Sequence, residues 1–241
     1  MAHPVGAAPR RESGRECIGL IGGLGVAATV HYYKELVREH TVRGVQPNLL
    51  IAHADVNRVL SDAAKGQTLA LAEYLAGFLH RLALAGATIG VLPSVTPHIC
   101  APELKELSPI PLVSLPDAVL GEIQARQLKR VALFGTRFTI ESGMFGQLPR
   151  VEVVKPRPDE IDFIHRTYVQ MATDGRGTTE HYDGLRALAH KLCERDKVDA
   201  VVLAGTDLSL IFNEANTDFP HIDGGRGHIL AIMRKVMEGD S

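Results

Sequence analysis

Hydrophobic positions along this chain form short apolar runs that alternate with longer stretches of helical periodicity. The short runs predict strands at residues 17–21, 49–54, 89–92, 131–134, 151–154 and 200–203. Apolar residues at helical spacing predict helices at about 27–43, 69–85, 159–171, 180–195 and 227–237, with two more after residues 97 and 114. Strands that alternate with helices are typical of a mostly parallel sheet whose faces are covered by helices.

The order of strands and polar loops repeats once along the chain. Residues 87–94 and 198–205 are apolar, β-branched runs that end in small polar residues, and residues 18–23 match residues 131–136 in a similar way. We therefore expect two similar Rossmann-like α/β lobes with mostly parallel sheets, related by an approximate twofold axis. Open α/β sheets bind ligands beyond the carboxyl ends of their strands, so the predicted site is a cleft between the lobes. A chance match is the alternative, because buried parallel strands resemble one another.

This pattern also suggests how the chain is divided. We expect a disordered tail over residues 1–16, a first lobe over residues 17–115 and a second lobe over residues 116–228. The last segment, residues 229–241, is expected to form a helix that crosses back to the first lobe. The tail has arginines but no apolar run, so it is not expected to be a signal peptide.

Composition excludes several classes of function. The 241 residues are 45% hydrophobic, which is enough for one large core or two small linked cores. A net charge of −2 gives no electrostatic reason to expect nucleic acid or an anionic membrane as a partner. Three widely spaced cysteines fit a reducing cytoplasm, the expected location. The eleven histidines lack metal-ligand spacing, so no metal is expected.

A glycine-rich turn, Gly22–Gly25, separates the first strand from the first helix. Its glycines lack the spacing of a dinucleotide fingerprint, which makes a nucleotide the least favoured ligand. Its backbone amides, including that of Gly23, lie at a helix N-terminus, where a carboxylate or phosphate is favoured. A plain tight turn is the alternative.

The corresponding loop of the second lobe contains Gly135 and Thr136, followed by Thr139. The two threonine hydroxyls precede a helix, so they either cap that helix or contact a ligand. The sequence does not decide between the two.

The loop after the 89–92 strand contains Ser94, Thr96 and His98. A serine near a histidine suggests a hydrolase, but no Gly-x-Ser-x-Gly elbow surrounds Ser94 and no partner acid is evident. His98 and His228 follow loops that end at the predicted cleft, which makes both candidates for function. The segment before His228 is rich in glycine, so it either approaches a ligand closely or simply connects two elements.

Together these motifs resemble the aspartate/glutamate (Asp/Glu/hydantoin) racemase superfamily, over about residues 18–237 and in family order. The matching motifs are I-G-L-I-G-G-L-G (18–25), P-S-V-T-P-H (93–98), the 135–143 stretch, L-A-G-T-D-L (203–208) and the 223–228 segment. The resemblance implies an amino-acid or dicarboxylate substrate, no cofactor and a homodimer.

Two departures from the family pattern concern its pair of catalytic cysteines. In the family's mechanism one thiolate removes the α-proton, and a thiol on the opposite face returns one. This chain has Ser94 and Gly205 at those positions, and neither replaces a thiolate. The usual racemase mechanism is therefore absent, and we expect the catalytic groups among His98, Asp207 and Ser94.

The remaining motif residues resemble a cradle for a carboxylate. Its expected members are Gly23, Asn57, Arg58, Thr96, Gly135, Thr136, Thr139, Gly205, Thr206 and His228.

Three functions remain open, because a fold-level resemblance establishes the scaffold and not the reaction. The favoured one is a cofactor-independent racemase or epimerase of an amino acid or related small carboxylate, with non-standard proton-transfer residues. The alternatives are a single-base lyase or decarboxylase and a non-catalytic carboxylate-binding protein.

Overall fold

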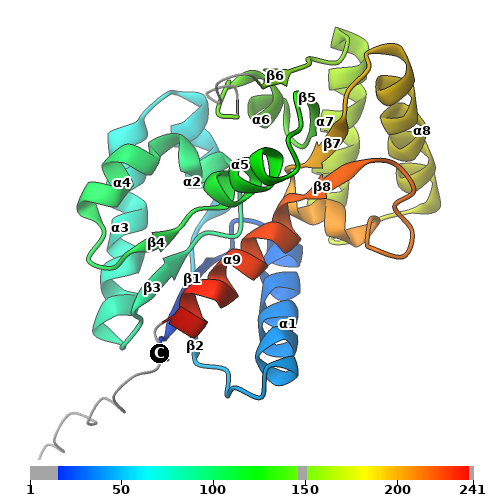
Figure 1. The fold of residues 1–241 in the computed structure, drawn as a ribbon. Helices are drawn as coiled ribbons and strands as arrows, with labels where there is room; N and C mark the ends of the chain where they lie inside the picture. The colour runs from blue at the N-terminus through cyan, green and yellow to red at the C-terminus, as the bar shows by residue number, and fades with distance from the viewer. Residues whose placement is uncertain (1–15, 146–150, 239–241) are drawn as a thin grey trace, which may run out of the picture.

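The computed structural model describes residues 16–145 and 151–238 and shows two lobes of the same design (Figure 1). The first lobe contains β1 (Ile18–Gly22), α1 (Val26–Val42), β2 (Leu49–His53), α2 (Val56–Ala64), α3 (Thr68–Leu84), β3 (Ile89–Val91), the 3-10 helix η1 (Thr96–Cys100), α4 (Ala101–Leu107) and β4 (Leu112–Val113). The rest of the chain forms α5 (Leu115–Ala125), β5 (Arg130–Phe134), α6 (Arg137–Glu141), β6 (Glu152–Val153), α7 (Pro158–Asp174), α8 (Thr179–Arg195), β7 (Ala200–Leu203), the 3-10 helix η2 (Thr206–Leu210), β8 (His221–Asp223) and α9 (Gly224–Glu238).

Each lobe is built on a four-stranded parallel sheet, and the two sheets have equivalent strand orders. The first sheet has the order β2-β1-β3-β4 and the second has the order β6-β5-β7-β8. Gly22 at the end of β1 pairs with His53 at the end of β2, and Phe134 at the end of β5 pairs with Leu203 at the end of β7. The predicted architecture of two similar α/β lobes with parallel sheets is confirmed.

The sheet of the first lobe is covered by helices on both faces. All five residues of β1 are buried. On one face α3 contributes Leu71, Leu75 and Leu79, which recur every four residues and form one apolar stripe. On the other face α1 contributes Tyr32 and Leu36. Because both faces are covered, strands of this sheet appear in the sequence as nearly continuous apolar runs.

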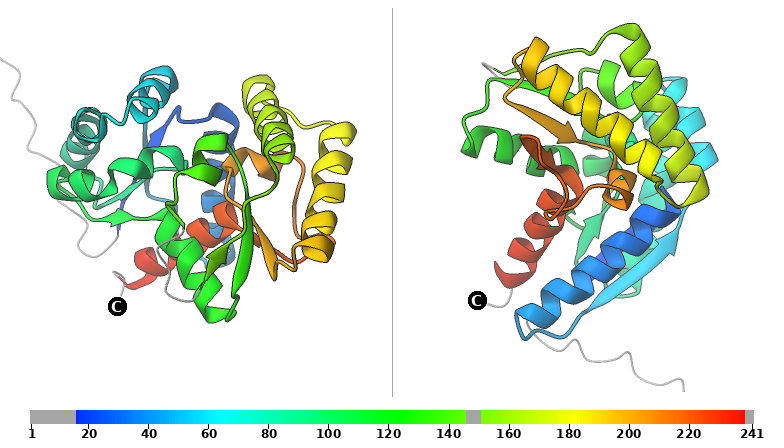
Figure 2. Two further views of the ribbon diagram at one scale, coloured as in Figure 1. Left: turned by 90° about the horizontal axis from the view of Figure 1, so that it is seen from above. Right: turned by 90° about the vertical axis from the view of Figure 1, so that its right-hand side faces the viewer.

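The last helix returns from the second lobe to the first. Helix α9 begins directly after β8 and lies beside α1 on the first sheet (Figures 1 and 2). Its Ile229, Ile232 and Met233 are fully buried in a cluster with Ile18 and Tyr32. The end of the chain therefore helps to hold the two lobes together.

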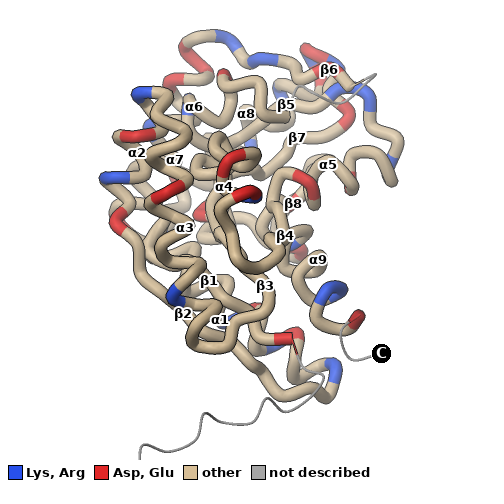
Figure 3. The backbone as a smooth tube through the Cα atoms, turned by 90° about the vertical axis from the view of Figure 1, so that its left-hand side faces the viewer, with Lys and Arg blue, Asp and Glu red and all other residues tan. Residues whose placement is uncertain are grey.

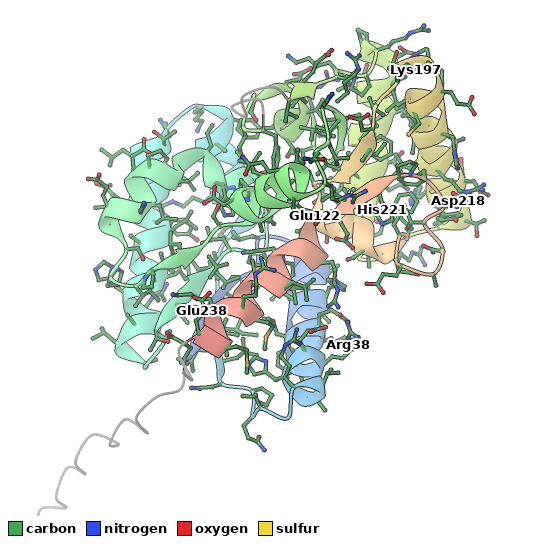
Figure 4. The ribbon with its side chains drawn as sticks, in the orientation of Figure 1. Arg38, Glu122, Lys197, Asp218, His221 and Glu238 are labelled. Carbon is green, nitrogen blue, oxygen red and sulfur yellow. The ribbon has the colours of Figure 1, made fainter. Side chains whose placement is uncertain are left out.

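Helix α5 leads from the first lobe into the core of the second. Leu115 and Val119 are buried among second-lobe residues. At its end, the Arg126 guanidinium donates a 2.6 Å hydrogen bond to the carbonyl oxygen of His221 on β8. Glu122, which pairs with Arg126, lies near His221 in Figure 4.

Two short elements, α2 and β8, are not predicted by the sequence pattern. Helix α2 is nine residues long and buries only Val59 and Ala63, too few positions for a clear periodicity. Asp55 caps it by accepting a hydrogen bond from the Asn57 amide. Strand β8 has three residues, which is too short for an alternating pattern to be recognised.

Basic and acidic positions are interspersed on the face formed by α2, α3 and α4 (Figure 3). This distribution matches the small net charge of the chain. Within the described ranges, no helix combines the length and apolar character needed to span a membrane.

Candidate functional site

The strand-end loops of the two lobes meet directly. The Thr206 hydroxyl at the start of η2 donates a buried 3.1 Å hydrogen bond to the Pro93 carbonyl oxygen after β3. Gly205 precedes Thr206 and Ser94 follows Pro93, so the two motif positions singled out in the sequence lie at one contact between the lobes. This contact is the natural centre of a candidate site.

Asp207 bridges the two lobes at the same place. Its Oδ1 accepts a 3.1 Å hydrogen bond from the Ala28 amide in the first turn of α1, and its Oδ2 accepts a 3.0 Å bond from the Tyr168 hydroxyl on α7. The side chain is almost completely buried, and this burial raises the pKa of Asp207, although its hydrogen bonds and nearby His31 oppose the rise. A buried carboxyl of raised pKa is a candidate acid or base.

The glycine-rich turn is already filled by groups of the protein. The Gly23 amide donates a 3.1 Å hydrogen bond to the Thr29 hydroxyl. Gly23 has a φ of +81°, and a Cβ there would lie 2.4 Å from the Ala54 carbonyl oxygen and 2.8 Å from Nε2 of His53. Gly23 therefore makes a tight turn whose amide is occupied, and the carboxylate at the start of α1 is the protein's own Asp207.

His98 is oriented by the backbone. Its Nδ1 lies 2.8 Å from the Ser94 carbonyl oxygen, to which it must donate, and its Nε2 accepts a long 3.5 Å bond from the Leu115 amide. Burial lowers the pKa of His98 to about 4, so the ring is neutral near pH 7. The described residues make no hydrogen bond to the Ser94 hydroxyl, so His98 does not activate it as a nucleophile here.

His228 has a structural environment. It is fully buried on α9, its Nε2 lies 2.9 Å from the Val113 carbonyl oxygen and its Nδ1 lies 3.0 Å from the Tyr32 hydroxyl. The geometry requires Nε2 to donate and Nδ1 to accept. Burial lowers the pKa of His228 to about 3, which keeps the ring neutral. This residue joins α9, α1 and β4.

The second-lobe loop uses its threonines to begin a helix. The Thr136 hydroxyl accepts a 3.1 Å bond from the Thr139 amide and caps α6, and the two hydroxyls lie 3.0 Å apart. Gly135 lies against the next loop, since a Cβ on it would be 3.3 Å from the Gly205 nitrogen. Of the two predicted readings for Thr136, the structure shows the helix cap.

Several polar side chains lie near the carboxyl ends of the first-lobe strands. Asn57 and Arg58 are exposed on α2, which packs against η1, where Thr96 is located. The Arg58 guanidinium stacks 4.1 Å above the Tyr74 ring centre and pairs through Nε with Asp62 at 3.6 Å. Within residues 16–145 and 151–238, no hydrogen bond involves the side-chain amide of Asn57 or the hydroxyl of Thr96. These groups are therefore available to a ligand.

A cavity of 580 Å³ opens beside this loop. Its first-lobe wall includes His98, Ile99 and Lys105, and its second-lobe wall includes Ser142 and Met144. Its lining is mostly apolar. The cavity lies next to the Thr206–Pro93 contact rather than on it.

No cysteine of this chain provides a reactive thiolate at the site. Burial raises the pKa of the Cys100 thiol to about 12, and burial also raises the pKa values of Cys17 and Cys193. Among the described residues, no three His, Cys, Asp or Glu side chains come together as metal ligands would.

Tyr168 is the site residue that sequence reasoning missed. It lies on α7, remote in sequence from every family motif, and its helical position has no distinguishing spacing. The one sequence feature that points towards Tyr168 is Gly205. Because glycine has no side chain, it leaves space that another residue fills.

Comparisons with known proteins agree with this fold. Residues 21–232 match the sequence model of the Asp/Glu/hydantoin racemase family. A candidate Asp/Glu racemase from Yersinia pestis superposes with a TM-score of 0.79 at 24% identity, covering 92% of this chain and 99% of that one. An aspartate racemase homologue from Pyrococcus horikoshii superposes with a TM-score of 0.75 at 24% identity, covering 92% of this chain and 98% of that one. Glutamate racemase from Thermus thermophilus superposes with a TM-score of 0.62 at 17% identity, covering 95% of this chain and 84% of that one. These structural likenesses show a shared fold.

Proposed function

Because this chain belongs to the Asp/Glu/hydantoin racemase family, we propose that it is a cofactor-independent enzyme acting on a small carboxylate. In this proposal it moves a proton to or from one face of the substrate's α-carbon. Such a step leads to elimination, decarboxylation or hydrogen exchange at the α-carbon rather than to racemisation.

The observation that carries the proposal is an asymmetry between the two loops that meet at the interlobe contact. The second-lobe loop presents Asp207, a buried carboxyl of raised pKa. The first-lobe loop presents Ser94, and the neighbouring His98 is neutral and turned towards the backbone. Racemisation needs a proton acceptor on one face and a donor on the other, so a buried carboxyl of raised pKa in the second-lobe loop, with a serine and a neutral histidine in the first-lobe loop, supports single-face chemistry.

The first lobe supplies the groups that would hold the substrate. We assign Asn57, Arg58, Ser94 and Thr96 to its carboxylate, because they follow β2 and β3 and, apart from the ion pair of Arg58 Nε with Asp62, leave polar atoms unused by the described chain. The Arg58 guanidinium provides the positive charge, and hydroxyl and amide groups provide the hydrogen bonds. The adjacent cavity gives an apolar α-substituent room to extend.

The second candidate is a racemase or epimerase, favoured by family membership itself. It requires a proton donor on the first-lobe wall, where Ser94 occupies the relevant position. A homodimer in the cytoplasm, implied by the family resemblance, also remains a proposal. The exposed apolar row of Val26, Val30 and Tyr33 along α1 supports self-association, which light scattering would test.

The test follows substrate protons in D₂O by NMR with L-aspartate, L-glutamate and phenylmalonate as probes. We expect incorporation of deuterium at the α-carbon, or release of CO₂, by the wild type and its loss in Asp207→Asn. Arg58→Ala should raise KM at least tenfold. The matched control Arg81→Ala, whose guanidinium stacks on Phe78 at 4.2 Å on α3, should not.

Two outcomes would overturn this proposal. Activity that survives Asp207→Asn unchanged would place the proton transfer elsewhere. No turnover of any probe, together with thermal stabilisation by malonate, would identify a carboxylate-binding protein.

A further inference from the structure

The space beside Gly205 belongs to Tyr168. A Cβ on Gly205 would lie 2.2 Å from Cε2 and 2.9 Å from Cζ of the Tyr168 ring, so any side chain there would force the ring to shift. The Gly205 backbone has a φ of −77° and a ψ of 119°, which every residue adopts readily. Glycine is therefore needed here for space and not for conformation, and the ring on α7 and the missing side chain form a matched pair.

The hydroxyl of this ring is tied to the buried acid of the site. It donates a 3.0 Å hydrogen bond to Oδ2 of Asp207, whose other oxygen is held by the Ala28 amide. Asp207 is only 2% exposed, whereas Tyr168 is half-buried. Of this pair, Tyr168 is the residue with the larger exposed surface.

We propose, building on the function proposed above, that Tyr168 is a catalytic residue that relays the proton between Asp207 and the substrate's α-carbon. In the deprotonation direction the α-carbon C–H bond breaks, its proton passes to the phenol oxygen and its electron pair stays on the enediolate. At the same time the phenol O–H bond breaks, and its proton passes along the 3.0 Å hydrogen bond to Oδ2 of the Asp207 carboxylate. Asp207 is left as a neutral carboxylic acid that exchanges its proton with water, and the reverse transfer returns a proton to the same face.

The relay leaves the tyrosine neutral throughout, in agreement with its surroundings. Burial raises the pKa of the Tyr168 phenol well above its usual range, and the Asp207 charge raises it further. A free phenolate is therefore disfavoured, and a concerted exchange of two protons avoids forming one. A hydroxyl that both gives and receives a proton suits this task, and phenylalanine in its place does not.

The enclosure of Asp207 disfavours direct proton transfer between its carboxyl and the substrate. The Asp207 oxygens both accept hydrogen bonds, and the carboxyl is enclosed by the start of α1 and the ring of Tyr168. A substrate carbon approaching the second-lobe wall meets the ring first. Tyr168 thus also excludes water from the carboxyl, which sustains the raised pKa of Asp207.

The experiment compares Tyr168→Phe with the wild type in the D₂O assay on L-aspartate, L-glutamate and phenylmalonate. Tyr168→Phe keeps the ring over Gly205 and removes only the hydroxyl. The matched control is Tyr182→Phe, which removes a second-lobe hydroxyl bonded to the Asn216 carbonyl. Folding is verified for each variant by urea denaturation, and malonate affinity by calorimetry.

We expect Tyr168→Phe to lower the rate about 100- to 10,000-fold, with malonate affinity within threefold of the wild type. Tyr182→Phe should retain the wild-type rate. Site-specific incorporation of a fluorinated tyrosine at position 168, which lowers the phenol pKa, should shift the basic limb of the pH–rate profile to lower pH. The same replacement at position 182 should not.

The results distinguish the role of Tyr168 from the proposed function. A wild type that turns over a probe, with Tyr168→Phe equally fast, overturns the role of Tyr168 and leaves the proposed function standing. A wild type that turns over none of the probes overturns both. A Tyr168→Phe variant that loses malonate binding as well as rate assigns Tyr168 to substrate binding and contradicts the relay.

Discussion

The Tyr168 ring occupies the volume that a side chain on Gly205 would need, with only 2.2 Å between Cε2 of the ring and a Cβ at position 205. Two segments of the second lobe, α7 and the loop after β7, thereby interlock at the contact between the lobes. This relationship determines which substitutions the site tolerates.

Gly205→Ala should lower the free energy of unfolding by about 1–3 kcal/mol, because the methyl group forces the tyrosine ring to shift. In a Tyr168→Ala background the same change should cost much less, and a double-mutant cycle from urea denaturation measures the coupling. Gly77→Ala on α3 is the control: its Cβ would meet open space, so it should stabilise by about 0.5–1 kcal/mol. Equal costs of Gly205→Ala in both backgrounds would contradict the interlocking.

The same geometry bears on introducing cysteines at positions 94 and 205. Ser94→Cys with Gly205→Cys should fold poorly unless Tyr168→Ala is added, since the new thiol would collide with the ring.

Thr206→Val should destabilise the protein by about 1–3 kcal/mol, because it leaves the Pro93 carbonyl buried without its donor. Thr206→Ser keeps a hydroxyl and should therefore lose less stability than Thr206→Val. Urea denaturation of both variants measures the difference. If valine and serine are equally well tolerated, the Thr206–Pro93 bond contributes nothing to joining the lobes.

Acid stability should depend on Glu39, which is buried on α1 and ion-paired with Arg226 of α9 at 2.6 Å and with Arg43. The Arg226 guanidinium, aided by that of Arg43, lowers the pKa of Glu39 to about 2. Its folded pKa lies below the unfolded value, so its contribution is complete above about pH 5 and is lost as pH falls towards 2.

Glu39→Gln should therefore cost about 1–3 kcal/mol at pH 7 and make the acid limb of the stability curve shallower. Glu141→Gln, which breaks an exposed pair with Arg137, serves as the control and should change stability little. A Glu39→Gln curve that runs parallel to the wild type down to pH 3 would exclude this role of Glu39.

The contribution of Asp207 to stability should depend on pH in the opposite direction to that of Glu39. Its folded pKa lies above the unfolded value, so the folded chain holds the proton more tightly and stability falls as pH rises through that window. Asp207→Asn removes the buried charge and should match or exceed the wild-type stability at pH 8 while abolishing turnover. Unfolding curves at pH 5 and pH 8 measure this, and a large loss of stability at pH 8 would mean that Asp207 is structural.

The sequence predicts the scaffold well because the scaffold repeats. Apolar runs that end in polar loops are local features, and they place Ser94 and Gly205 at the ends of equivalent strands. Their meeting at the Thr206–Pro93 contact follows from that symmetry. The family resemblance, carried by the same motifs, is confirmed by the match over residues 21–232.

The sequence does not predict how the site is filled. Asp207 bonds to Ala28, 179 residues earlier, and to Tyr168, 39 residues earlier. No periodicity encodes such contacts. Sequence reasoning also leaves the Thr136 hydroxyl open between two roles, and only the geometry of α6 shows that it caps a helix.

Proton transfer on one face is tested by the stereochemistry of the α-carbon. L-aspartate and L-glutamate are incubated with the wild type in D₂O, phenylmalonate derivatives with two different α-substituents are treated in parallel, and products are separated by chiral chromatography. Single-face transfer should yield α-deuterated amino acid of retained configuration, or a single enantiomer of the decarboxylated acid. Accumulation of the deuterated D-amino acid, or a racemic acid, would show proton transfer on both faces and contradict single-face chemistry.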